Sequence, residues 1–98
     1  MPTNANVKLV KKEQLKEDIF KFTCESKEIS NNAKPGQFVE IKISESYEPF
    51  LIRPISIYNI DGDNIEIIFQ VKGKGTEILS NKKVGDKINA LGPLGNGT

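Results

Sequence analysis

Apolar residues in this chain recur at every second position, in short runs separated by turn residues. The clearest run covers residues 37–43, where Val39, Ile41 and Ile43 are each two positions apart. A repeat of two is the side-chain period of a β-strand, whereas a helix places apolar residues three and four positions apart. Six such runs are predicted strands, at residues 6–12, 18–25, 37–43, 50–60, 65–72 and 87–91. The pattern therefore predicts an all-β fold, a small antiparallel barrel or sandwich.

Turn and helix signals fill the spaces between these runs. Asn-Asn and Pro-Gly pairs predict that the polar residues 26–36 form a loop, and DGDN at 61–64 predicts a hairpin turn. One short helix is expected, Thr76–Ser80, with Thr76 as its N-cap.

The composition excludes several classes of protein. With 98 residues the chain forms one domain, and its 14 Lys+Arg against 13 Asp+Glu argue against a strongly basic nucleic-acid binder. There is no histidine, and the single Cys24 allows neither an internal disulfide nor a thiolate metal cluster. Cys24 is expected in the core. Without an apolar run near its start, the chain is expected to be a soluble, cytoplasmic protein with no membrane contact.

The sequence RPIS at residues 53–56 places an arginine directly before a strand-like alternation. A buried arginine needs a partner, and its planar fork suits a phosphate group. Pro54 cannot donate a ladder hydrogen bond, so this stretch is expected at an edge, a bulge or the opening of a strand. Arg53 and Ser56 point to opposite faces of a regular strand, so both reach one ligand only if the strand bends. The alternative is a surface ion pair beside an ordinary strand serine.

Two glycine-rich segments, GKGT and LGPLGNG, are also of interest. In GKGT at 73–76, the glycines allow close approach to the backbone, and the helix start that follows favours an anion. Thr76 is expected to cap the helix or to donate to that anion; a plain turn is the alternative. LGPLGNG at 91–97 is expected to be a C-terminal tail or a loop leading to a further domain.

The order of four segments along the chain is informative: PGQF at 35–38, RPIS at 53–56, GKGT at 73–76 and LGPLGNG at 91–97. In that order and at that spacing, the chain resembles the FAD-binding domain of the ferredoxin–NADP reductase superfamily. Within it, the chain is most similar to the electron-transfer subunits of bacterial type B dihydroorotate dehydrogenases. Flavin subunits of sulfide dehydrogenases, transhydrogenases and hydrogenases share much of the pattern and stay as alternatives. The resemblance implies a six-stranded antiparallel Greek-key β-barrel.

The resemblance also implies a set of FAD-binding residues. Arg53 would meet the pyrophosphate, Pro54 would set the backbone, Ile55 would pack beside the flavin, and Ser56 would face its N5 edge. Many relatives carry an aromatic residue where this chain has Ile55. The remaining expected cofactor-binding residues are Ile68, Phe69 and Gln70, mainly through their backbone, and Gly75 and Thr76 at the pyrophosphate.

By the same resemblance, the chain is one part of an FAD-dependent oxidoreductase. FAD would relay electrons between a nicotinamide or iron–sulfur site and a catalytic dehydrogenase subunit, in dihydroorotate oxidation for pyrimidine biosynthesis. The [2Fe–2S] cluster and the NAD site would lie in a part absent from these 98 residues. Residues 1–98 are therefore expected to be an excised flavin domain, inactive alone.

Two other functions fit the pattern less well. A small barrel of the oligonucleotide-binding type is opposed by the near-neutral charge and the few aromatic residues. A purely docking role would place a partner on residues 44–50, with Tyr47 and Phe50 as anchors. The lysine-rich start of the chain is expected to be a solvated strand face.

Overall fold

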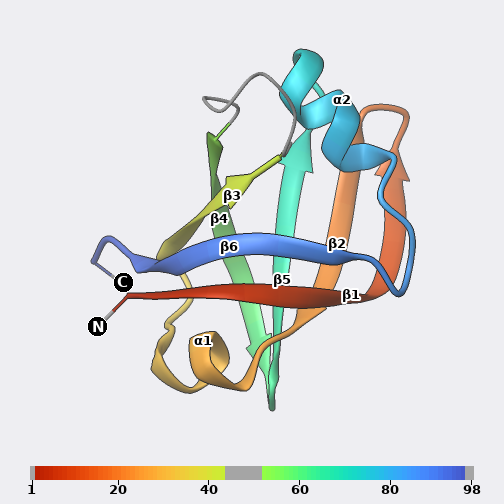
Figure 1. Ribbon diagram of the computed structural model, residues 1–98. Coiled ribbons are helices and arrows are strands. Elements are labelled where there is room, and N and C mark those ends of the chain that lie inside the picture. Colours follow the sequence, from red (N-terminus) through yellow and green to blue (C-terminus); the bar gives the residue numbers. More distant parts are fainter. Residues whose placement is uncertain (1, 44–51, 97–98) are drawn as a thin grey trace.

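The computed structural model describes residues 2–43 and 52–96, and in them six strands form a closed antiparallel barrel (Figure 1). The order around the barrel is β1-β2-β5-β4-β3-β6. The strands are β1 (Thr3–Lys16), β2 (Ile19–Glu25), β3 (Phe38–Lys42), β4 (Ile52–Asp61), β5 (Asn64–Gln70) and β6 (Lys87–Leu94). The expected all-β, six-stranded antiparallel barrel is confirmed. The predicted docking segment 44–50 lies outside the described residues.

Pairing between the first and last strands closes the barrel. The first part of β1 pairs with β6, from Thr3 opposite Gly92 to Lys8 opposite Lys87. From Lys8 onward β1 also pairs with β2, with a register shift between Leu9 and Lys11. The strand therefore bends and serves two neighbours, because a bulge increases the local twist of the strand that carries it. This bend explains why β1 is longer than the alternation at residues 6–12 predicted.

The alternating apolar residues fill the inside of the barrel, as the period of two predicted. Val39, Ile41 and Ile43 are all buried. The ring of Phe69 stands edge-on to that of Phe22, with the ring centroids 5.0 Å apart. The expectation that Cys24 belongs to the core is confirmed, since it is 1% exposed.

A short helix stands at each end of the barrel, so the expectation of one helix is wrong (Figure 1). Helix α1 (Lys27–Asn32) lies in the predicted loop; the side chain of Ser26 caps it by accepting a 3.2 Å hydrogen bond from the N–H of Ile29. Ile29 is fully buried, so this helix folds against the core. A single apolar residue in a polar stretch gives no periodicity, and the sequence pattern could not reveal it.

The C-terminal glycine-rich segment is not a tail throughout, because β6 runs on to Leu94 and buries Gly92 and Pro93. A Cβ added at Gly92 would lie 2.7 Å from Cγ1 of Val39. Glycine at this position therefore allows β6 to approach β3 closely.

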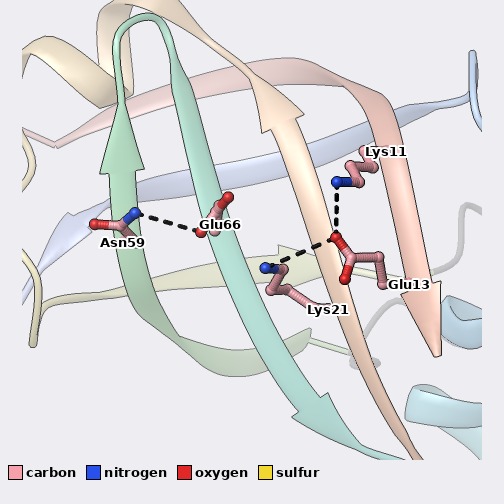
Figure 2. A network of polar contacts seen from close by, with 5 residues as sticks. All are labelled: Lys11, Glu13, Lys21, Asn59 and Glu66. Atoms are coloured by element: carbon pink, nitrogen blue, oxygen red, sulfur yellow. Dashed lines mark hydrogen bonds and ion pairs between the residues drawn. The ribbon is translucent and has the colours of Figure 1, made fainter. Parts of the chain in front are cut away.

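Polar side chains cover the outside of the barrel. Oε1 of Glu13 lies 3.0 Å from Nζ of Lys11 and 3.7 Å from Nζ of Lys21, and the amide of Asn59 donates to Glu66 across β4 and β5 (Figure 2). The hydrogen bond from Lys11 is the main reason that the pKa of Glu13 lies below its ordinary value. Such exposed pairs contribute little to stability. Within residues 2–43 and 52–96, no helix has the length and apolar character needed to cross a bilayer.

Candidate functional site

Strands β4 and β5 are joined over only part of their length. They pair from the hairpin, where Asp61 faces Asn64, up to Ile57 opposite Ile67. Beyond that point, the described residues Ile52–Ser56 of β4 pair with β3 alone. We call the β5-facing side of Ile52–Ser56 the open edge of β4. It contains the whole RPIS segment, so the predicted location of Pro54 at a strand edge is confirmed.

The direction of the backbone groups at the open edge follows from one hydrogen bond. The N–H of Ile57 donates to the carbonyl of Gln37, which precedes β3, over 2.7 Å. Because backbone groups alternate sides along a strand, those of Pro54 and Ser56 point away from β3, toward the open edge. Because proline has no N–H, position 54 places no unpaired donor at the open edge. The N–H of Ser56 accordingly points to the open edge, whereas its carbonyl faces β5 next to the last paired position, Ile57 opposite Ile67.

The side chains of Arg53 and Ser56 lie on opposite faces of β4, as the alternation predicted. The register with β3 is regular from Ile52 to Ser56, so there is no bulge in this pairing to bring them together. Ile55 points into the core and is 6% exposed, Arg53 is half-buried and Ser56 is exposed. A ligand that lies across an unpaired strand edge can nevertheless meet side chains from both faces. There is no bend at Pro54, and contact of both side chains with one ligand across the open edge stays a prediction.

Arg53 and the GKGT segment meet at the start of helix α2 (Lys74–Ser80). A Cβ added at Gly75 would lie 3.3 Å from Nε and 3.6 Å from Cγ of Arg53. The arginine side chain therefore packs directly against Gly75, where any other residue would crowd it. Nη1 of Arg53 donates to the carbonyl of Ile52 over 3.0 Å, and within residues 2–43 and 52–96 its side chain has no second hydrogen bond. Two motifs that are far apart in the sequence thus form one basic corner.

Thr76 shapes the loop before α2. Its Oγ1 accepts hydrogen bonds from the N–H groups of Lys72 (2.8 Å) and Gly73 (3.2 Å). The N-cap of α2 is Gly73, so the expectation that Thr76 occupies this position is wrong. Thr76 is the third residue of α2, and its hydroxyl holds the preceding loop through these two hydrogen bonds. The N–H groups of Gly75 and Thr76 belong to the first turn, which a helix leaves without intrahelical acceptors.

The expected β5 residues lie beside the open edge but differ in orientation. Phe69 points into the core, whereas Ile68 is half-buried and Gln70 is exposed. The Gln70 amide donates to Asp18 over 2.7 Å. Ile43 is a neighbour of this site that the sequence reasoning missed, since its Cδ1 would lie 3.3 Å from a Cβ at Gly75. Its alternation with Ile41 marks it only as a core residue. In the described ranges, no cluster of His, Cys, Asp or Glu could hold a metal ion.

Comparison with known proteins identifies the family of the chain. The model of the family described as "Oxidoreductase FAD-binding domain" matches residues 6–98. The "Dihydroorotate dehydrogenase B (NAD(+)), electron transfer subunit" of Lysinibacillus sphaericus is 44% identical over 93% of this chain, and that of Bacillus pumilus is 41% identical over 95%. The chain spans only 36% and 37% of these two relatives.

Solved structures show the same fold. The chain superposes on an NADH-dependent reduced ferredoxin–NADP oxidoreductase with a TM-score of 0.83 and 37% identity, covering all of this chain and 36% of that one. The ferredoxin reductase of carbazole 1,9a-dioxygenase, at 23% identity and a TM-score of 0.77, shares the fold.

The barrel fold and the family match together identify a flavin-binding domain of the ferredoxin reductase type. The chain belongs to the oxidoreductase FAD-binding domain family, and it resembles the electron-transfer subunits of dihydroorotate dehydrogenase B.

Proposed function

We propose that residues 1–98 act as the flavin domain of a longer electron-transfer subunit, and that FAD lies along the open edge of β4 up to the start of α2. The contact between Arg53 and Gly75 carries this proposal. It places a guanidinium beside free N–H groups of a helix start, which is a suitable arrangement for a pyrophosphate. The absent side chain at Gly75 leaves the room that this arrangement needs.

Each expected residue has a role that follows from its place. Arg53 holds phosphate oxygens with its planar fork, while Gly75 and Thr76 donate from the first turn of α2. Pro54 and Ser56 present their backbone to the ring system at the open edge, and the hydroxyl of Ser56 positions the N5 edge. Ile55 supports the edge from the core in place of an aromatic ring. Ile68, Phe69 and Gln70 offer backbone groups from the opposite side.

FAD, when bound, supplies the hydride and single-electron transfer, so this chain needs no acid–base residue of its own. The protein binds and orients the cofactor. Ser56 has no partner in the described residues that could activate it as a nucleophile.

The names of the similar proteins suggest the parent reaction. We propose that it is dihydroorotate oxidation for pyrimidine biosynthesis, with a catalytic dehydrogenase subunit as partner, because the curated relatives at 44% and 41% identity are electron-transfer subunits of that enzyme. The [2Fe–2S] and NAD sites would belong to the length of these relatives that this chain does not span. A cytoplasmic location is part of the same proposal.

A second candidate is the flavin domain of an electron-bifurcating transhydrogenase. It is favoured by the 37% identity to the NADH-dependent reduced ferredoxin–NADP oxidoreductase structure. Activity of the longer polypeptide with dihydroorotate, against activity with ferredoxin and NADP, separates the two candidates.

FAD binding by wild type and Arg53→Ala tests the cofactor site. We expect wild type to retain FAD after gel filtration, with perturbed visible absorbance and quenched fluorescence. The substitution should weaken binding by about 1.5–3 kcal/mol, roughly 10- to 150-fold, because charge-assisted hydrogen bonds are lost.

Lys27→Ala is the control, since Lys27 is an exposed residue of α1 at the other end of the barrel. Equal FAD affinity in Arg53→Ala and wild type would refute the site. If the chain alone does not retain FAD, the same variants are compared in the longer polypeptide.

A further inference from the structure

A hollow of about 430 Å³ lies between α2 and strands β1, β3 and β6. Three lysines line it, namely Lys42 of β3, Lys82 just after α2 and Lys87 at the start of β6. The amides of Asn6 and Asn89 add to its polar wall, and apolar side chains including Ile43 line the rest. No carboxylate is among the described residues that line it.

Strand pairing brings these residues together from distant parts of the sequence. Asn89 faces Asn6 on one side and Lys42 on the other, so the three form a row across β1, β6 and β3. The amide of Asn89 donates to that of Asn6 over 3.2 Å. Lys87 precedes Asn89 by two positions and therefore projects from the same outer face.

Among the described residues, the lysines of this hollow have no ion-pair partner. The ion pairs found in the described ranges join Glu13 to Lys11 and Lys21, and none includes Lys42, Lys82 or Lys87. Lys87 also stands directly opposite Lys8 in the β1–β6 register. Like charges at facing positions of a sheet destabilise it, and an anion held here would relieve the part of this repulsion that Glu25, which faces Lys8 on the other side, does not offset.

These lysines are not required by the nearby end of α2. A cation near a helix C-terminus commonly bonds its last carbonyls. Lys12 already does so, since its Nζ donates to the carbonyls of Ser80 (2.6 Å) and Lys82 (2.9 Å). The ammonium groups around the hollow therefore take no part in capping α2.

We propose that this hollow is a binding site for a small phosphate-bearing anion. Its volume is within the range of small-molecule sites, its cations are of the kind that bind phosphate as point charges, and single-sign clustering concentrates the field. The whole chain carries a net charge of only +1, so the clustering does not follow from composition.

The site is distinct from the proposed FAD site. Ile43 borders both, with the hollow on one side and the contact of Arg53 with Gly75 on the other. The inference does not depend on flavin binding, and its test uses the chain without FAD.

Amide chemical shifts of the 98-residue chain, recorded during titrations, test the proposal. The probes are inorganic pyrophosphate, ADP and adenosine. We expect saturable shifts at Lys42, Lys82 and residues 87–89 with a phosphate-bearing probe and none with adenosine. Binding of ADP alone would indicate a nucleotide as ligand, and equal or tighter binding of pyrophosphate would indicate a free phosphate compound.

Two charge-matched double variants give the comparison. Lys42→Gln/Lys87→Gln should weaken binding at least about tenfold, because two of the three cations are removed. Lys27→Gln/Lys34→Gln removes two exposed lysines in and after α1, at the opposite end of the barrel, and should leave the affinity within about twofold. All four lysines are exposed or lie outside the core, and thermal melts verify that both variants fold.

Arg53→Ala serves as the third variant and should keep the shifts at the hollow. The proposal is overturned if both double variants lose equal affinity, which would show general attraction to a basic surface. It is also overturned if shifts are confined to Arg53 and residues 73–76, if adenosine binds as well as ADP, or if no probe saturates.

Discussion

At the scale of single residues, two glycines of one loop differ in what surrounds them. A Cβ at Gly75 would crowd Arg53 and Ile43 at 3.3 Å, whereas no described atom would lie within 4 Å of a Cβ at Gly73. Gly75→Ala should therefore displace the arginine and weaken FAD binding by about 1 kcal/mol, roughly fivefold. Gly73→Ala is the matched control and should change FAD affinity little. Flavin fluorescence titrations measure both; equal affinities would mean that the position of Arg53 is unimportant.

At the scale of elements, β1 stabilises α2 through one side chain. Lys12 is half-buried, and its Nζ donates to two carbonyls at the end of α2 and lies 5.5 Å from the ring centroid of Phe20. Lys12→Met keeps the apolar stem but loses the charge, so it should lower the free energy of unfolding by about 1–2 kcal/mol. Urea denaturation measures this value.

Lys16→Met is the control at this scale, because Lys16 is exposed on the same strand. It should cost less than about 0.5 kcal/mol. Equal losses in the two variants would show that the contacts of Lys12 with α2 add no stability. The lysine-rich start was predicted to be a solvated face, and this is wrong for Lys12, which bends inward where β1 passes α2.

At the scale of the whole molecule, the closed barrel excludes Cys24 from water. Burial raises the pKa of its thiol from 9.0 to about 12. The thiol ionises at a lower pH in the unfolded chain than in the folded barrel. The free energy of unfolding is therefore unaffected below pH 9 and falls as the pH rises toward 12. The loss should be about 1.4 kcal/mol per pH unit in that interval.

Cys24→Ala is the comparison, because lysines and tyrosines titrate in both proteins. Denaturant unfolding is measured from pH 8 to 11. The free energy of unfolding of wild type should fall relative to that of Cys24→Ala as the pH rises. A difference that is constant with pH would mean that the thiol is not protected by the fold.

The sequence by itself determined the fold class and the residues of interest. Alternation is a local property, and it marked Val39, Ile41 and Ile43 as residues of one face before any contact was known. Pro54 indicated an edge, a bulge or the opening of a strand because of its missing N–H, and the structure shows an unpaired edge. Gly75 indicated close approach of a ligand to the backbone because of its missing side chain, and this stays a prediction.

Only the tertiary structure decided where these residues meet. Helix α1 packs on the core through a single buried apolar residue, Ile29, so the sequence shows no apolar periodicity there. The contact of Arg53 with Gly75, the open edge beside β5, and the lysines around the hollow each join segments that are distant in the chain. Such neighbours are set by which strands pair and where the pairing stops, and closing the barrel fixes this through long-range hydrogen bonds that a local pattern does not encode.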